Sequence, residues 1–191
     1  MLPLAKTMNK SLCLLVVLTT LLLGTLPSTA QAQEKRLSPH ETISTVVNGN
    51  RVTVVYGRPY TTKPGSTVAR KIWGGLVPYD KVWRLGADEA TLLTTQKAIA
   101  IGGTTVPAGA YTLFLLPSAD GTAKLIISKQ IGQWGEEYDA ANDLARVDLT
   151  KTTLDQPVNQ FTLEILKSPA GGAIQISWEN LAYSIPFNPA P

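Results

Sequence analysis

The chain has 191 residues, with 17 Lys and Arg against 14 Asp and Glu, one histidine and one cysteine. Residues 1–32 hold two lysines, then an apolar run over 12–26, then Ala-Gln-Ala, which is the layout of a cleaved secretory signal. We therefore expect a signal peptide over 1–32 and a periplasmic or secreted mature protein. Removing its two lysines leaves 15 basic against 14 acidic side chains, so the net charge of +3 falls to +1. This balance argues against a nucleic-acid partner, and no later run is long enough for a transmembrane segment.

Thiol and metal chemistry are limited by the residue counts. The only cysteine, Cys13, lies inside the apolar signal run, so the mature chain has no disulfide, thiol nucleophile or cysteine ligand. The only histidine is His40, so no imidazole pair can hold a metal, and a lone histidine among carboxylates would be a weak transition-metal site. We expect no metal site and no cofactor.

Short runs of β-branched and aromatic residues, separated by Gly, Pro, Asn and Asp, predict many short strands. The first two, 42–47 and 51–56, flank Asn48-Gly49-Asn50, which predicts a hairpin because Asn-Gly tolerates the positive φ of a tight turn. The Pro- and Gly-rich segment 57–79 follows. It is too long for a hairpin connection, and loops of that length are often functional, so a site is expected there first.

The remaining elements follow in chain order. Residues 98–101 and Val106 flank a Gly-Gly turn, and the apolar runs 111–116 and 125–127 suit central strands. Residues 136–145 predict one or two helical turns.

The C-terminal part predicts three strands. Residues 161–165 and 174–179 alternate between apolar and polar side chains and are joined by Gly171-Gly172. A last strand, 182–187, is expected to end at its prolines.

This pattern predicts a mainly β, single-domain antiparallel β-sandwich over residues 33–187, with at most one short helix. A jelly-roll-like or barrel-like arrangement is the alternative. Residues 188–191 are expected to form a C-terminal tail.

Several polar side chains could carry chemistry. His40 opens the first strand, where it could cap or pack, or act as a general base or ligand-binding group. Arg58 follows Tyr56 at strand parity, so its guanidinium would point inward and need a partner. Arg84, with the carboxylates four and five residues later, offers an ion-pair network or the floor of a polar pocket.

The adjacent carboxylates Asp88 and Glu89 are expected to point to different sides of a strand, which makes a poor catalytic pair for glycoside hydrolysis. Trp83 could pack in the core or provide a platform for a sugar or planar ligand.

Six motifs occur in order along the chain and together resemble one bacterial family. They are SPHET at 38–42, YGRP at 56–59, KIWGGLVPY at 71–79, VWRLGADEAT at 82–91, VPAGAY at 106–111 and GQWG at 132–135. The family is the domain of unknown function numbered twenty-nine-eleven. The resemblance implies an exported, mostly β protein and supplies no established activity or catalytic residue. Residues 61–68 depart from the pattern as an apparent insertion.

These observations favour a binding or accessory module over an enzyme. Its polar pocket would be built from His40, Tyr56, Arg58, Arg84 and Asp88, and its partner would be a small molecule, glycan or protein. The alternative is a metal-independent hydrolase or lyase that uses His40 as general base, with Arg58 or Arg84 stabilising an anion. A third interpretation treats all the motifs as turns and ion pairs that hold the sandwich together.

Overall fold

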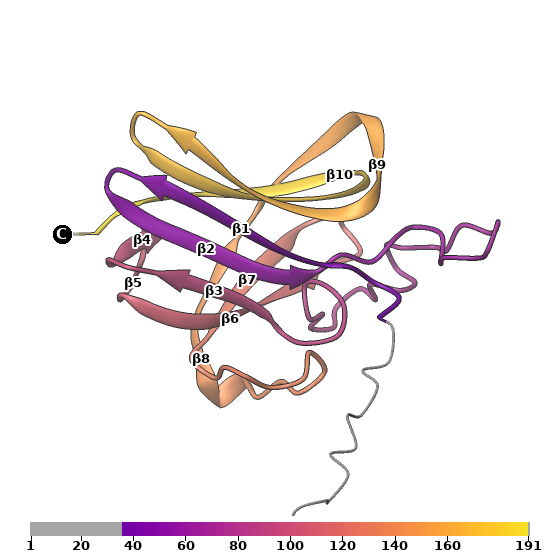
Figure 1. Ribbon diagram of the computed structural model, residues 1–191, viewed down its shortest axis with the longest axis horizontal. Helices are drawn as coiled ribbons and strands as arrows, with labels where there is room; N and C mark the ends of the chain where they lie inside the picture. Colours follow the sequence, from indigo (N-terminus) through magenta and orange to yellow (C-terminus); the bar gives the residue numbers. More distant parts are fainter. Residues whose placement is uncertain (1–35, 191) are drawn as a thin grey trace, which may run out of the picture. The chain divides into compact units, whose positions relative to one another are not determined.

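The structure is a computed structural model that describes residues 36–190, and the predicted signal peptide lies outside them. It contains a six-stranded antiparallel sheet in the order β1-β2-β3-β6-β7-β8 and a four-stranded antiparallel sheet in the order β5-β4-β10-β9 (Figure 1). The strands are β1 (His40–Val47), β2 (Asn50–Gly57), β3 (Thr91–Thr95), β4 (Ile99–Ile101), β5 (Thr104–Val106), β6 (Gly109–Pro117), β7 (Ala123–Ser128), β8 (Asp143–Asp148), β9 (Thr150–Ser168) and β10 (Gly171–Pro189). The predicted β-sandwich is confirmed.

The first hairpin forms where the sequence predicts it. Asn48 and Gly49 both have positive φ, 48° and 73°, as a tight two-residue turn requires, and β1 pairs with β2 from His40–Gly57 to Val47–Asn50. The alternation in β2 buries Val52, Val54 and Tyr56 on one face.

The core lies between the two sheets and combines apolar side chains from both. The six-stranded sheet contributes Leu93, Leu113 and Leu125, and the four-stranded sheet contributes Phe161 and Ile176, all of which are fully or almost fully buried. Such burial stabilises the folded state by roughly 25 cal/mol per Å² of apolar surface. The inward-facing strand positions of the two sheets therefore hold the sandwich together.

The one or two helical turns predicted within residues 136–145 are present as one short turn, and the rest of this range is not helical. A single 3-10 turn spans Ala140–Asn142, and Asp139 caps it by accepting a hydrogen bond of 2.9 Å from the backbone N–H of Ala141. From Asp143 onward the chain is strand β8, because its backbone pairs with β7. A neighbouring strand edge thus decides the conformation of a segment that has no helical apolar stripe.

The C-terminal strands are longer than predicted. The expected strands 174–179 and 182–187 form one strand, β10, which passes through two register shifts around Glu179 (φ 52°). Gly171 and Gly172 are not the turn: they pair with Ser168 and Lys167, and the turn lies at residues 169–170. Pro186 does not end the strand, and the start of the predicted tail belongs to β10, whose Pro189 pairs with Ile99.

Residues 58–90 connect β2 to β3 with only isolated bridges and turns, so the irregular segment reaches further than predicted (Figure 1). Within residues 36–190, no helix has the length and apolar character that a membrane span needs.

Candidate functional site

Backbone contacts hold the irregular segment against the six-stranded sheet. Trp83 exchanges two backbone hydrogen bonds of 2.8 Å with Leu115 of β6, and the N–H of Ala87 donates to the carbonyl of Gly57 at 3.3 Å. Downstream, the N–H of Gly135 donates to the carbonyl of Asp88 at 3.1 Å. Residues 83–90 are therefore fixed between the end of β2 and the segment 132–135.

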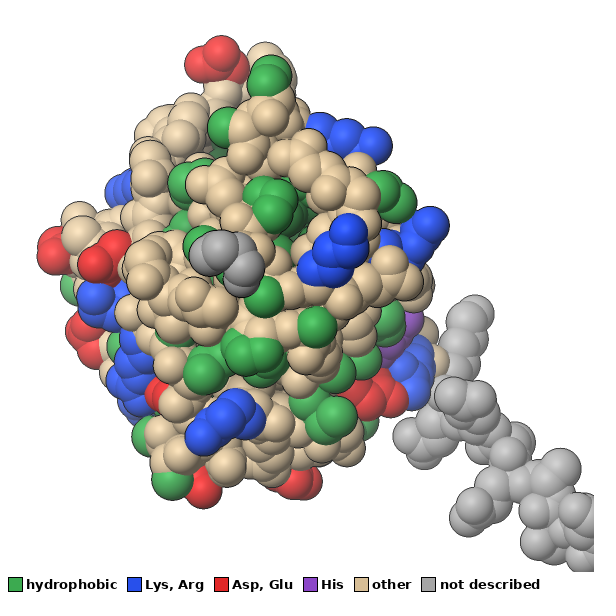
Figure 2. Space-filling view, turned by 90° about the vertical axis from the view of Figure 1, so that its left-hand side faces the viewer, with side chains coloured by type: hydrophobic (Ala, Val, Ile, Leu, Met, Phe, Trp, Pro, Cys, Tyr) green, Lys and Arg blue, Asp and Glu red, His purple; other side chains and the backbone are tan. Residues whose placement is uncertain are grey.

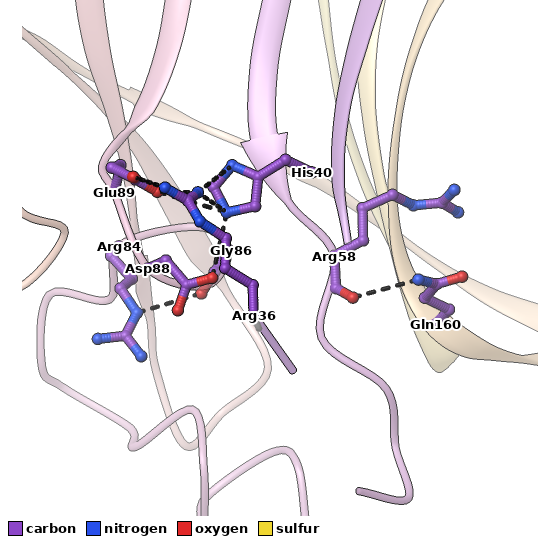
Figure 3. Close-up of polar contacts among 8 residues, drawn as sticks. All are labelled: Arg36, His40, Arg58, Arg84, Gly86, Asp88, Glu89 and Gln160. Carbon is purple, nitrogen blue, oxygen red and sulfur yellow. Dashed lines mark hydrogen bonds and ion pairs between the residues drawn. The ribbon is translucent and has the colours of Figure 1, made fainter. Parts of the chain in front are cut away.

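This fixed segment brings two carboxylates to the only histidine. His40 Nε2 lies 3.1 Å from Asp88 Oδ2 and 3.4 Å from Glu89 Oε2. Figure 3 shows the imidazole and both carboxylates converging, although His40 is separated from them by nearly fifty residues. One ligand atom from each of the three residues lies within 4.8 Å of the others. We call these three residues the His40 cluster.

The expectation that Asp88 and Glu89 point to different sides was wrong. Asp88 has φ 65°, in the left-handed region, and the segment is not a regular strand at this point. The turn at Asp88 therefore redirects its carboxylate to the side of its neighbour. Left-handed backbone is tolerated best by Gly, Asn and Asp, which suits this position to its residue.

Arg36 supplies a positive charge to the same cluster. Its Nη1 lies 2.8 Å from His40 Nε2 and donates to Glu89 Oε2 at 2.6 Å, and its Nη2 pairs with the other oxygen of Glu89. Burial raises the pKa of Glu89, but the hydrogen bond from Arg36, a backbone hydrogen bond and the charges of Arg36 and His40 together hold that pKa below its usual range. The sequence analysis did not single out Arg36, because nothing local connects it to residue 89.

A pocket of about 430 Å³ adjoins the cluster, and Asp88 lines both. We call it the large pocket. Its aromatic lining comprises Tyr60, Trp83, Phe114 and Tyr138. Its charged lining comprises Lys63, Arg70, Arg84, Asp88 and Glu136. The irregular segment contributes most of these residues, as its length and composition indicated.

The charges of the large pocket are not balanced. Arg84 pairs with Glu136 at 2.6 Å, and Asp88 is engaged by His40. Arg70 donates to the backbone carbonyls of Tyr60 and Thr61, and no carboxylate in residues 36–190 lies within 4.0 Å of its guanidinium. Burial lowers the pKa of Arg70. Arg70 was not among the predicted site residues.

A second pocket, of about 310 Å³, also adjoins the cluster and is called the small pocket. His40, Glu89 and Arg36 line it, together with Tyr56 and Gln133. Gln133 is 8% exposed, and its Oε1 has no hydrogen-bond partner in the described part of the chain, while its Nε2 donates to Thr112 at 3.2 Å. Figure 2 shows the single histidine at the molecular surface beside acidic and basic side chains. The cluster is therefore open to solvent.

The chain matches the family described as Protein of unknown function (DUF2911) over residues 38–187. The chain belongs to the DUF2911 family. No curated protein and no solved structure matches it. The matched range includes every candidate site residue from the sequence analysis. Each motif of this DUF2911 protein can therefore be located in the structure.

The YGRP motif of the DUF2911 protein connects the two sheets. The hydroxyl of Tyr56 accepts from the N–H of Leu163 at 2.9 Å and donates to Glu41 at 3.0 Å, and burial raises the pKa of Tyr56 to about 12. Arg58 donates to the carbonyl of Phe161 at 3.1 Å and pairs with Glu41 at 2.9 Å. These contacts account for the motif without a ligand.

The expected network of Arg58 and Arg84 with Asp88 and Glu89 does not form. Arg58 takes its carboxylate partner from β1 and points away from the His40 cluster, toward β9 (Figure 3). Arg84 finds Glu136 instead. Each arginine pairs with a carboxylate on a segment that lies beside it in space, which the order of charges along the chain does not reveal.

Trp83 serves mainly as a core residue. It is 8% exposed, and its ring meets Phe161 edge-on at 5.1 Å and stacks on Trp178 at 5.9 Å. It contributes one edge to the wall of the large pocket. Of the predicted site residues, the large pocket therefore includes Trp83, Arg84 and Asp88, while the small pocket includes His40, Tyr56 and Glu89.

Proposed function

We propose that this DUF2911 protein is an exported binding module whose large pocket takes a small ligand with an anionic group on an apolar or planar body. The observation that carries the proposal is Arg70, a partly buried guanidinium that donates to carbonyls but meets no carboxylate within residues 36–190. A cation removed from water gains from an anionic partner, and guanidinium binds carboxylate or phosphate through two parallel hydrogen bonds.

The charge count of the large pocket supports the same ligand class. Three cationic side chains, Lys63, Arg70 and Arg84, stand against two acidic ones, Asp88 and Glu136. Both acidic side chains are already engaged, one by His40 and the other by Arg84. An incoming anion therefore meets a net positive wall, and electrostatic attraction inside a pocket is stronger than at an open surface.

The aromatic lining supports a planar or apolar ligand body. Phe114, which is 1% exposed, lines the large pocket and meets Tyr138 edge-on at 4.9 Å, and Tyr60 also lines it. A volume of about 430 Å³ falls within the roughly 300–1,000 Å³ of small-molecule sites. Rings supply contact area and a few charged groups supply orientation.

The test compares matched anionic and neutral probes on the tag-free mature protein. Benzoate and phenyl phosphate should raise the melting temperature and give measurable heats of binding, whereas benzamide and phenol at the same concentrations should bind less. Arg70→Gln should remove the difference between the two classes, and Arg70→Lys should retain part of it.

Lys124→Gln is the control, because this exposed cation lies outside both pockets and pairs with Asp148 on the surface. It should leave probe binding unchanged. Equal binding of anionic and neutral probes, or binding that survives Arg70→Gln, would contradict the proposal.

Export is part of the proposal and rests on the signal-like segment 1–32. Expression of the full chain in a bacterial host with an intact secretion pathway should yield a protein that starts at Gln33. Intact mass of the protein in the periplasmic and culture fractions measures this, and an unprocessed chain retained in the cytoplasm would refute it.

The second candidate is a metal-independent hydrolase or lyase with His40 as general base. The 3.1 Å contact of His40 with Asp88 favours it, since a carboxylate commonly orients a catalytic imidazole. Both expected anion stabilisers already have a carboxylate partner, Arg58 in Glu41 and Arg84 in Glu136, so either would have to exchange that partner for the anion. Hydrolysis of p-nitrophenyl esters that persists in metal-chelated protein and vanishes in His40→Ala would support it, and equal rates in both proteins would exclude it.

A further inference from the structure

The His40 cluster has the composition of a metal site. It offers one imidazole nitrogen and two carboxylate oxygens from residues on two separate segments, all within 4.8 Å. Imidazole and carboxylate are common ligands of divalent transition metals in proteins. We propose that His40, Asp88 and Glu89 bind a divalent transition-metal ion, with Zn²⁺ the best match. This site shares Asp88 with the lining of the large pocket, but it is argued from the cluster alone and does not depend on the proposed function.

The distances fit such an ion. In a tetrahedral Zn²⁺ site with bonds of about 2.0–2.2 Å, neighbouring ligand atoms are about 3.4 Å apart. His40 Nε2 lies 3.1 Å from Asp88 Oδ2 and 3.4 Å from Glu89 Oε2. The two carboxylates thus already stand near the required spacing from the imidazole nitrogen.

The charge of the cluster also suits a divalent cation. Two carboxylates carry two negative charges, and the guanidinium of Arg36, which contacts His40 and Glu89, supplies one positive charge. A divalent ion neutralises both carboxylates, so it would take over the place of this internal cation. Arg36 is 37% exposed at its side chain and can move into solvent. In the structure Arg36 occupies the position of the positive charge that a metal ion would supply.

Gln133 provides an independent indication of a ligand next to the cluster. It lines the same small pocket as His40 and Glu89, is 8% exposed, and leaves its Oε1 without a partner among the described residues. A buried acceptor without a hydrogen bond is costly, so native sites normally satisfy it with water or a ligand.

The ligand set distinguishes between metals. Mg²⁺ and Ca²⁺ prefer six or more oxygen ligands, while an imidazole nitrogen favours zinc and its neighbours. Titration of tag-free mature protein, stripped with EDTA and dialysed, should therefore show one equivalent of Zn²⁺ bound. Mg²⁺ at the same concentration should give no signal. Competition with a chromophoric chelator measures the dissociation constant.

Four variants test the assignment. His40→Ala, Asp88→Asn and Glu89→Gln should each weaken Zn²⁺ binding by more than about tenfold, since loss of even an outer-shell contact typically costs 10–100-fold. Arg36→Gln should strengthen it by about two- to fivefold, the factor that corresponds to losing a competing exposed ion pair. A merely structural salt bridge at this place would not produce that gain.

Asp148→Asn is the matched control, because it removes an exposed carboxylate far from any histidine and should leave Zn²⁺ affinity unchanged. Circular dichroism identifies variants that fail to fold. If a ligand variant does not fold, the effect of Arg36→Gln on Zn²⁺ affinity and the preference for Zn²⁺ over Mg²⁺ still test the proposal. Absence of Zn²⁺ binding, binding equal in all variants, or stronger binding of Mg²⁺ would overturn the proposal.

Discussion

Gly57 and Ala87 approach so closely that a Cβ on Gly57 would lie 2.2 Å from the carbonyl oxygen of Ala87. The contact joins the end of β2 to the segment that carries Arg84, Asp88 and Glu89. The absence of a side chain at position 57 therefore allows this segment to pack directly against the end of β2.

We expect Gly57→Ala to lower the free energy of unfolding by about 1–3 kcal/mol, the range for overpacking a tight contact. The added methyl group must push the backbone of Ala87 away. Urea denaturation of wild type and variant measures the change. Thr152→Ala, on an exposed stretch of β9, should shift the midpoint little, and equal stability of all three proteins would show that the contact tolerates a side chain.

Arg58 should contribute to stability rather than to ligand binding. Its guanidinium bonds the carbonyl of Phe161, the hydroxyl of Thr162 and the carboxylate of Glu41, and so links β9 to the first hairpin. Arg58→Ala should cost about 1–3 kcal/mol of unfolding free energy, because partly buried acceptors lose a charged donor. Lys124→Ala, which breaks an exposed pair, should cost less than about 1 kcal/mol. Similar losses of unfolding free energy in both variants would argue against a stabilising role of Arg58 between β9 and the first hairpin.

Alkaline pH should destabilise the protein through Tyr56. Burial raises the pKa of Tyr56 from 10.0 to about 12, so the unfolded chain loses this proton before the folded one. Its contribution to stability is complete below pH 10 and is lost as the pH rises toward 12. Denaturation midpoints between pH 9 and 12 should fall more steeply in wild type than in Tyr56→Phe.

Tyr111, Tyr138 and Tyr183 also have raised pKa values from burial, so some decline remains in the variant. Parallel curves for Tyr56→Phe and wild type would show that Tyr56 does not contribute to the loss of stability at alkaline pH.

The ion pair between Arg84 and Glu136 should lower the affinity of the large pocket for anions. Glu136 neutralises Arg84 at 2.6 Å, so Glu136→Gln should free that guanidinium and strengthen binding of phenyl phosphate, as isothermal calorimetry can measure. Glu137→Gln removes the neighbouring exposed carboxylate, which does not line the pocket, and should have little effect. Weaker binding in Glu136→Gln would mean that Glu136 itself contacts the ligand.

The sequence by itself determined the fold class, the first hairpin and the alternating burial of its regular strands. These follow from local physical rules: Asn48-Gly49 accepts positive φ, and side chains in a strand alternate between faces, which places Val52 and Val54 in the core. It also indicated that the long irregular segment would carry the candidate site, because few regular elements could form there.

Tertiary structure alone decided the lengths of β9 and β10, the partners of the arginines and the grouping of His40 with Asp88 and Glu89. A bulge at Glu179 joins two predicted strands because pairing with β9 continues past it. Arg58 and Arg84 pair with carboxylates on neighbouring segments in space, since ion pairs form over a few ångströms regardless of sequence separation. The left-handed turn at Asp88 brings two carboxylates to one imidazole, and residues 83–90 are held in place by close contacts with Gly57 and Gly135.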